Sequence, residues 1–312
     1  MKFYKPKFWD KRNHISLFAI LLLPLSLFVL IKNYFENIKI KKNFYDLKTI
    51  CVGNIYIGGT GKTPLVNNLA SHFKKKYKTC IIKKNYHSHL DEKMLLESKH
   101  RVIFEKTREL SITKAENEKA EMLIFDDGLQ EKKINYDLKI VCFNSLKLDG
   151  NGLVLPAGPL REKLSEIKNY DVVFINGNLN KDSAKFVKKI KNFNPNIKIF
   201  TGKYIPKDYL KLKKKKYIIF SGIGNPHTFS DTLKSLKIKF KRHEIFPDHY
   251  EFKESDLLRL KSLAKLEKCE LLTTEKDYLR IKKSFKKTIN FLKVELLVNE
   301  EKQFYKYLKD KL

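Results

Sequence analysis

A glycine-rich loop ending in Lys-Thr is the part of this 312-residue sequence whose residue types point most directly to chemistry. Residues 53–63 read GNIYIGGTGKT; an apolar run at 47–52 precedes them, and a helical pattern opening with Pro64 follows. Closely spaced glycines let backbone N–H groups approach phosphate oxygens, and the helix directs its positive end toward the same anion. We therefore predict that nucleotide phosphates are bound by consecutive residues of this loop, namely Gly58, Gly59, Thr60, Gly61, Lys62 and Thr63.

One position of the loop departs from the usual phosphate-binding pattern. The strict spacing G-x-x-x-x-G-K-T needs glycine at position 56, where this chain has Tyr56. A chance glycine-rich turn could resemble such a loop, but this window combines three glycines, Lys-Thr, an upstream strand and a downstream helix. The combination favours nucleotide binding, with Lys62 neutralising phosphate charge and Thr63 available to ligate Mg²⁺.

Two adjacent carboxylates, Asp126 and Asp127, end a second apolar run at residues 122–125. A carboxylate at the carboxyl end of a strand can reach the metal that the loop threonine holds. Standing alone, Asp-Asp-Gly would more often be a turn, and its place after a hydrophobic run is what favours a functional role. We predict a Mg²⁺ region of hard oxygen ligands from Thr63, Asp126 and Asp127, and the pattern leaves open which aspartate contacts the ion.

Positive charge dominates the surface chemistry of the chain. It has 65 Lys and Arg against 35 Asp and Glu, a formal net charge of +30. Such an excess favours anionic partners, which include phosphates, an acidic bilayer surface and nucleic acid, but charge alone does not choose among them. Lysine runs such as residues 74–76 and 213–216 also occur as plain solvated faces, so no run is given a specific ligand.

The four cysteines are scattered, with neither a C-x-x-C pair nor histidines at metal-ligand spacing. This usage is typical of buried small hydrophobes in a reducing compartment. The sequence therefore predicts no zinc site and a catalytic part that faces the cytoplasm. The cysteines are Cys51, Cys80, Cys142 and Cys269.

Residues 16–31, SLFAILLLPLSLFVLI, form the most hydrophobic stretch, and basic residues lie on both sides of it. Sixteen helical residues rise only about 24 Å, less than a hydrocarbon core of about 30 Å, and Pro24 is expected to kink the helix. A buried core helix would show a polar face beyond Ser16 and Ser26, and no small-residue cleavage site of a signal peptide follows. An anchor or monotopic helix is favoured, and whether it spans stays open.

Six motifs, in the same order and over nearly the whole chain, resemble those of the tetraacyldisaccharide 4'-kinase (lipid A 4'-kinase) family. The long motif GNGLVLPAGPLRE at residues 150–162 and TTEKD at 273–277 are not general features of phosphate-binding loop proteins. The apolar N-terminal segment also belongs to the family pattern. The other four motifs are VGNIYIGGTGKTP, DDGLQ, SGIGNPHTF and FPDHY.

The resemblance implies transfer of the γ-phosphoryl group of ATP, with Mg²⁺, to the 4'-hydroxyl of a tetraacylated glucosamine disaccharide 1-phosphate, giving lipid IVA. An acylated acceptor lies in the bilayer, so the anchor would hold the site at the membrane surface while basic side chains meet the acceptor phosphate. The expected location is the cytoplasmic face of the inner membrane. Neither nucleic acid nor an obligate protein partner is expected.

Individual roles are likewise implied by the resemblance. Asp91, in LDEKMLL, matches an aspartate that activates the acceptor hydroxyl, and His249 in FPDHY matches a histidine that assists it. Lys62 matches the lysine that steadies the β and γ phosphates, and Glu162 matches an acidic residue near the substrate. Without the family, Asp91 would be read as a helix cap and His249 as a turn residue.

The chain also departs from the family pattern close to the expected acceptor site. Where the family usually has S-R-G-Y-G, this chain has KKNYH at residues 83–87, and Leu90 replaces the glycine before the aspartate motif. Glu131 stands where D-D-G-F-Q-H ends in histidine, and Leu129 replaces the aromatic residue. These changes bear on acceptor positioning more than on nucleotide binding.

Apolar β-branched runs alternate with helical stretches along the chain, which predicts a doubly wound α/β fold of the P-loop NTPase type. New strand-helix units open after the GNG-to-LRE motif, so we place a soft boundary near residue 168. We expect a membrane-associated helix at 1–32, a nucleotide-binding domain at 33–168 and a second, smaller α/β lobe at 169–312.

Two other functions fit parts of the sequence. A membrane-targeted P-loop ATPase switch would have the loop K-G-G-T-G-K-T, but Ile57 occupies the position of its first lysine. A noncatalytic polyanion-binding scaffold would explain the charge, but it leaves the ordered loop and the Asp-Asp strand end without a purpose.

Overall fold

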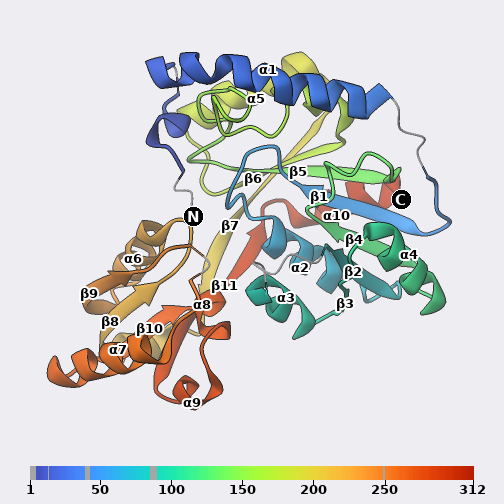
Figure 1. The fold of residues 1–312 in the computed structure, drawn as a ribbon. Helices are drawn as coiled ribbons and strands as arrows, with labels where there is room; N and C mark the ends of the chain where they lie inside the picture. The colour runs from blue at the N-terminus through green and yellow to red at the C-terminus, as the bar shows by residue number, and fades with distance from the viewer. Residues whose placement is uncertain (1–4, 13, 39–42, 85–89, 249) are drawn as a thin grey trace. The chain divides into compact units, whose positions relative to one another are not determined.

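The computed structural model describes residues 5–12, 14–38, 43–84, 90–248 and 250–312, and the chain divides into two compact units (Figure 1). Unit 1 consists of Met1–Lys84, His100–Lys203 and Leu296–Leu312. Unit 2 consists of Asn85–Lys99 and Tyr204–Glu295. The boundary that the sequence suggested at residue 168 falls inside unit 1, because the strands on its two sides pair with each other.

Unit 1 is built on a parallel sheet with the strand order β3-β2-β4-β1-β5-β6-β7. The chain moves outward from β1 in one direction and later in the other, which is the doubly wound topology that the alternation of strands and helices predicted. In such sheets ligands bind beyond the carboxyl ends of the strands, where the order reverses. The strands are β1 (Lys48–Gly53), β2 (Thr79–Lys83), β3 (Arg101–Ile103), β4 (Met122–Asp126), β5 (Leu138–Asn144), β6 (Val172–Asn176) and β7 (Lys198–Lys207).

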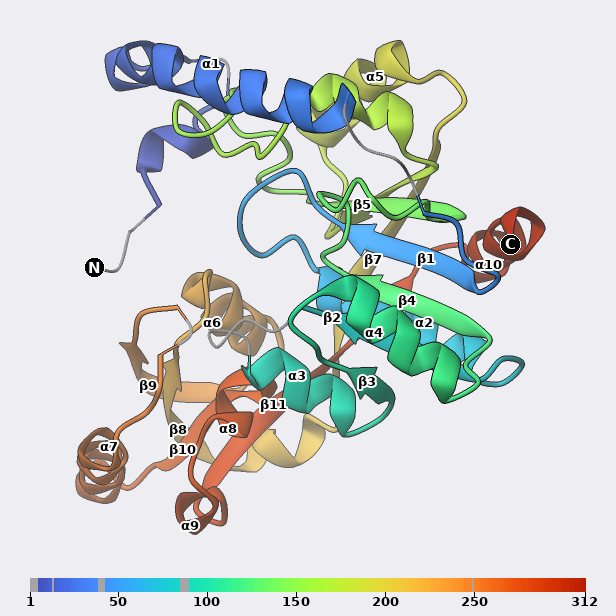
Figure 2. The ribbon, with the colours of Figure 1, turned by 45° about the vertical axis from the view of Figure 1, so that its right-hand side comes forward.

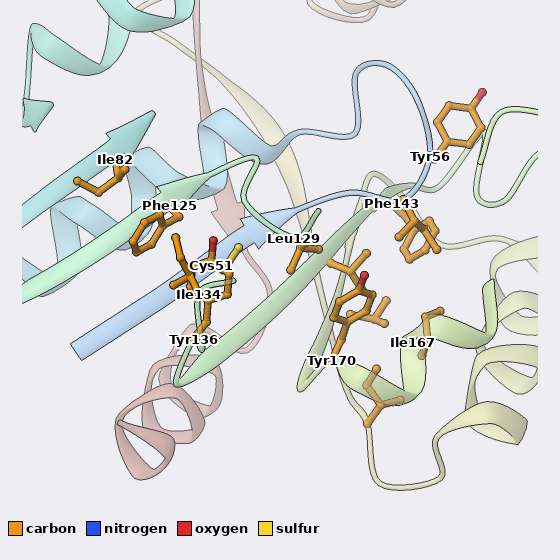
Figure 3. Close-up of a cluster of buried hydrophobic side chains, with 14 of the residues drawn as sticks. Cys51, Tyr56, Ile82, Phe125, Leu129, Ile134, Tyr136, Phe143, Ile167 and Tyr170 are labelled. Atoms are coloured by element: carbon orange, nitrogen blue, oxygen red, sulfur yellow. The ribbon is translucent and has the colours of Figure 1, made fainter. Parts of the chain in front are cut away.

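Both faces of the central strands are buried, as their continuous runs of apolar residues require. Figure 3 shows part of the main cluster, in which Cys51 of β1 and Phe125 of β4 lie with Tyr136 and Leu129. Burial raises the pKa of the Cys51 thiol to about 12, so this cysteine acts as a small hydrophobe. The helices of this unit are α1 (Leu17–Ile38), α2 (Lys62–Phe73), α4 (Arg108–Asn117), α5 (Lys181–Phe193) and α10 (Glu301–Lys311), with 3₁₀ turns η1 (Lys7–Asp10) and η3 (Leu164–Asn169).

Unit 2 has its own parallel sheet, ordered β11-β10-β8-β9. Alternate residues of β8 enter two different clusters: Ile218 and Phe220 lie in one, and Tyr217 and Ile219 in the other. Helices therefore cover both faces of this sheet too. Its elements are α3 (Leu90–Glu97), η4 (Leu210–Lys214), β8 (Lys216–Ser221), α6 (Pro226–Ser235), β9 (Lys239–Ile245), α7 (Glu254–Leu266), β10 (Glu270–Thr274), α8 (Glu275–Leu279), α9 (Lys283–Lys286) and β11 (Ile289–Val298).

The N-terminal helix α1 extends beyond the apolar run that identified it. Its 22 residues rise about 33 Å, which reaches the thickness of a hydrocarbon core. The sixteen-residue length argument against a full span therefore does not apply to the helix itself. Among the described residues, the segment Leu17–Phe35 is the single one long and apolar enough to cross a membrane, although one such helix is weak evidence for a span.

Figure 2 shows α1 running along one side of unit 1, where hydrogen bonds join it to the segment at residues 154–161. The Ser26 hydroxyl donates to the Val154 carbonyl at 2.9 Å and accepts from the Ala157 N–H at 3.1 Å. The rest of the helix is an exposed apolar band, in which Leu21 is 74% and Phe28 is 71% exposed. This combination suits a helix that contacts lipid on one side and protein on the other.

Tyr305 joins the C-terminal helix to α2, the helix that follows the glycine-rich loop. Its ring stacks on His72 with centroids 3.4 Å apart, and its hydroxyl donates to the Asn68 side-chain oxygen. We expect Tyr305→Ala to lower the free energy of unfolding by about 3–5 kcal/mol, because it removes a buried ring. Tyr305→Phe should cost only about 1 kcal/mol, because it removes one hydrogen bond. Urea titration checks both, and equal losses would contradict a packing role for the ring.

Candidate active site

The glycine-rich loop runs from the end of β1 to the start of α2, at the point where the strand order reverses. Gly58 and Gly61 have φ values of 107° and 86°, a left-handed conformation that strains any residue with a Cβ. Gly61 immediately precedes α2, so the first N–H groups of the helix face the loop. Both glycines are therefore required by the path of the backbone.

Tyr56, the departure from the usual spacing, is explained by packing. Its side chain is 1% exposed and belongs to the main apolar cluster. The backbone beside it bonds to the GNG-to-LRE motif: the Ile57 N–H donates to the Pro159 carbonyl at 2.8 Å, and the Arg161 N–H donates to the Ile55 carbonyl at 2.7 Å. The first half of the loop is thus a packed structural segment, and the second half is the part left for a ligand.

Three side chains hold the loop in shape from within unit 1. Asn54 donates to the carbonyls of Tyr56 and, at 3.2 Å, Gly58. Asn176, at the end of β6, donates to the Thr60 carbonyl at 2.6 Å. The Gln130 amide donates to the Asn54 carbonyl at 3.1 Å.

Two positively charged side chains, Lys62 and Arg161, lie beside Asp127. Its carboxylate lies 3.5 Å from the Lys62 ammonium and 3.0 Å from the Arg161 guanidinium. Burial raises the pKa of this carboxyl, but Lys62 and Arg161 outweigh burial, so the pKa lies below its usual value. Asp127 also has a φ of 63°, and its N–H donates to the Val52 carbonyl at 2.8 Å. The carboxylate is therefore ionised at neutral pH in a constrained turn.

Asp126, one residue earlier, is buried and turns toward the start of α2. Its Oδ2 accepts from the Thr63 hydroxyl at 3.2 Å and from the Lys83 ammonium at 2.5 Å. Its Oδ1 has no hydrogen-bond partner in the part of the chain that the structure describes. The hydroxyl of Thr60 and the side-chain oxygen of Asn176 are also buried without such a partner there. Unsatisfied buried oxygens are costly, and three of them beside one loop indicate that a ligand completes the site.

Glu162 is also buried, 5% exposed, but belongs to a neighbouring pocket. It accepts hydrogen bonds from the Tyr170 hydroxyl and, at 3.3 Å, from the Lys132 ammonium. Burial, and then the Glu162 charge, raise the Tyr170 pKa well above its usual value, so the phenol stays a donor. The pocket lies beside α1 and is lined by Leu30, Asn33, Tyr34, Gln130, Lys132, Arg161, Glu162, Lys163 and Glu166.

The acceptor-side pair of the sequence prediction is not placed by the structure. Asp91 lies in α3 of unit 2, with a side chain outside what is described, and His249 lies outside the described residues. Within unit 2, α3 packs against α8. The assignment of Asp91 and His249 as a catalytic pair stays a prediction.

In unit 2, Arg280, which follows the TTEKD motif, contacts the backbone of Tyr250 and of the SGIG motif. Arg280 donates to the Tyr250 carbonyl at 3.0 Å and to the Gly222 carbonyl at 2.9 Å. The fully buried Asp277 accepts from the Gly222 N–H at 3.1 Å and pairs with Arg280. Burial raises the Asp277 pKa despite this guanidinium. The polar residues of these motifs therefore have a positioning role in the structure.

Sequence reasoning missed several side chains that the fold brings to the loop. Asn176 ends an apolar run just as Asp126 does, so a search for polar residues at strand ends could have found it. Arg161 lies inside a motif that the sequence singled out, but only the adjacent Glu162 was considered. Lys83 ends β2 and was noted only as a departure from a family motif.

Comparisons with known proteins agree along nearly the whole chain. A family model described as Tetraacyldisaccharide-1-P 4'-kinase matches residues 18–312. The tetraacyldisaccharide 4'-kinase of Pelagibacter ubique is 45% identical over 308 residues, covering 97% of this chain and 96% of that protein. The corresponding protein of Rickettsia akari is 34% identical over 317 residues, covering 96% and 94%. A crystal structure of LpxK from Aquifex aeolicus in complex with ATP superposes with a TM-score of 0.70 at 25% identity, covering 95% and 99%.

Asn176 provides a test of the loop geometry. We expect Asn176→Ala to weaken binding of a non-hydrolysable ATP analogue about 3- to 10-fold, because the Thr60 carbonyl loses its donor, and to cost about 1 kcal/mol of stability. Asn180→Ala removes the cap of α5 at a similar cost in stability and leaves the loop intact. Calorimetric titration together with urea unfolding checks both, and equal binding losses would contradict a specific role for Asn176.

Proposed function

The chain belongs to the tetraacyldisaccharide-1-P 4'-kinase family, an ATP-dependent kinase family of lipid A biosynthesis, and we propose that residues 58–63 bind the ATP phosphates for this reaction. The observation that carries the assignment is the arrangement around the loop: Lys62 beside Asp127, and Thr63 beside Asp126, at the carboxyl ends of adjacent parallel strands. The ATP seen with the Aquifex aeolicus relative supports the same nucleotide here.

The donor set fits Mg²⁺. Thr63 and Asp126 offer hard oxygens, and the Oδ1 of Asp126, which has no partner among the described residues, is a buried acceptor of the kind that a hydrated cation satisfies. We assign these two residues to the metal and Asp127 to its surroundings, because the Asp126 carboxylate contacts the Thr63 hydroxyl, whereas Asp127 pairs with Lys62 and Arg161. When bound, the ion would neutralise charge on the transferring phosphoryl group.

Around the phosphates, the protein supplies positioning and fixed charge. Lys62 carries a charge toward the loop, the first N–H groups of α2 point the same way, and Arg161 holds the Asp127 turn in place. In the reaction the 4'-oxygen of the acceptor bonds to the γ-phosphorus, the bond from that phosphorus to the β–γ bridging oxygen breaks, and ADP leaves. The hydroxyl proton passes to a base, which the family resemblance assigns to Asp91 with help from His249.

The acceptor is an acylated disaccharide phosphate, and the surroundings of α1 support its entry from a membrane. The pocket with Glu162 borders α1 through Leu30, Asn33 and Tyr34, and it combines acidic side chains with Lys132 and Arg161. We place part of the sugar headgroup there, with Glu162 accepting from sugar hydroxyls. The exposed apolar band of α1 and the net charge of +30 support attachment to the anionic cytoplasmic face of the inner membrane.

Labelled ATP tests this assignment. Purified protein in detergent, incubated with Mg²⁺, γ-labelled ATP and tetraacyldisaccharide 1-phosphate, should place the label on the lipid. Lys62→Ala should reduce turnover on the order of 100-fold or more, whereas Lys75→Ala, an exposed lysine after α2, should not. Asp91→Asn should lower kcat more than it weakens ATP binding. Label released only as inorganic phosphate, at a rate independent of the lipid, would contradict the kinase site.

Vesicle binding tests the role of α1. The double substitution Leu21→Glu and Phe28→Glu should weaken binding to phosphatidylglycerol vesicles at least tenfold, because each buried apolar side chain contributes about 1.5–3 kcal/mol. Leu266→Glu is a matched control, since this residue is 81% exposed on α7. Co-sedimentation measures both, and equal binding by the two proteins would show that α1 does not enter the lipid.

A further inference from the structure

Lys83 occupies an unusual position for a lysine, buried in the floor of the nucleotide site. It ends β2, and the strand register sets it directly beside Asp126, the last residue of β4. The side chains are 6% and 0% exposed, and the ammonium lies 2.5 Å from Asp126 Oδ2. Residues in register on adjacent parallel strands point to the same face of the sheet, so the pair is built into the backbone.

The cations of the site are divided between the two aspartates. Asp127 is engaged by Lys62 and Arg161, whereas Asp126 has Lys83 as its ion-pair partner. A buried carboxylate that loses its countercharge is strongly unfavourable. In the metal-free protein, Lys83 therefore supplies the positive charge that Asp126 needs.

A divalent cation and an ammonium compete for the same carboxylate. Mg²⁺ held by Thr63 and by Asp126 Oδ1, which has no partner among the described residues, would bring two further positive charges to the carboxylate whose Oδ2 accepts from Lys83. Like charges repel at such short separation, so the metal weakens the attraction between Asp126 and Lys83. The strong acceptors that arrive at the same moment are nucleotide phosphate oxygens.

We propose that Lys83 is a second phosphate-binding lysine, which neutralises Asp126 in the empty site and moves to the nucleotide phosphates when Mg²⁺ occupies Asp126. The inference rests on the proposed nucleotide site. One consequence is that the Lys83–Asp126 ion pair holds both side chains in place before the metal binds. A second consequence concerns binding without metal. Because Lys83 neutralises Asp126, the wild type binds a metal-free nucleoside triphosphate more tightly than a protein that keeps Lys62 but lacks Lys83.

The test compares nucleotide binding with and without metal. Dissociation constants for a non-hydrolysable ATP analogue are measured in excess EDTA and in excess Mg²⁺, for the wild type and for Lys83→Met, Lys83→Arg and Lys75→Met. Lys83→Met should raise the constant measured in Mg²⁺ about tenfold or more, because the phosphates lose Lys83, and it should also raise the constant measured in EDTA, because Asp126 then faces the phosphates without a countercharge. Lys83→Arg, which keeps the charge, and Lys75→Met, which removes an exposed lysine, should stay within about threefold of the wild-type constants. An unchanged constant for Lys83→Met in Mg²⁺, or constants for Lys83→Arg that match those of Lys83→Met, overturn the proposal.

Thermal unfolding gives a second readout if Lys83→Met folds poorly. Mg²⁺ alone should raise the melting temperature of Lys83→Met more than that of the wild type, because the metal replaces the missing charge at Asp126. Equal or smaller shifts overturn the proposal. Failure of the nucleotide site itself would look different: the wild type would bind no analogue, or Lys62→Ala would bind it as well as the wild type does.

Discussion

The buried carboxylate of Asp126 is the constraint on which the nucleotide site depends. It is placed by the parallel pairing of β4 with β1 on one side and β2 on the other, which aligns Asp126 with Val52 and with Lys83. A charge at this depth needs a cation and hydrogen-bond donors close by. Thr63 at the start of α2 and Lys83 at the end of β2 meet that need, so strand register, helix start and site electrostatics form one arrangement.

Arg161 connects this arrangement to the N-terminal helix α1. Its guanidinium pairs with Asp127, its N–H donates to the Ile55 carbonyl in the loop, and its carbonyl accepts from Asn33 of α1 at 3.1 Å. Ser26 anchors the same helix to the preceding part of the segment. The helix proposed to contact lipid and the loop proposed to bind phosphate are therefore both hydrogen-bonded to one segment. For a kinase with a lipid acceptor, this is a direct way to place nucleotide chemistry near the bilayer surface.

In unit 2, hydrogen bonds around the SGIG and TTEKD motifs fix the positions of backbone segments. Asp277 and Arg280 tie the ends of β8 and β10 to the backbone at Tyr250. Asp277 of the TTEKD motif and Gly222 of the SGIG motif therefore have a structural role. Asp91, whose role as a base stays a prediction, lies on α3 of this unit.

The linear sequence by itself determined the family, the doubly wound fold, the phosphate loop and the apolar segment, because each depends on local spacing or on periodicity. Glycines before Lys-Thr, and aspartates after an apolar run, are patterns within one strand and its turn. Tertiary structure decided what no local pattern contains: the burial of Tyr56, the tie from Asn176 to Thr60, the pairing of Lys83 with Asp126 and the attachment of α1 to residues 154–161. These contacts join residues far apart in the chain, and they follow from strand order and register, which a single sequence does not encode in any one window.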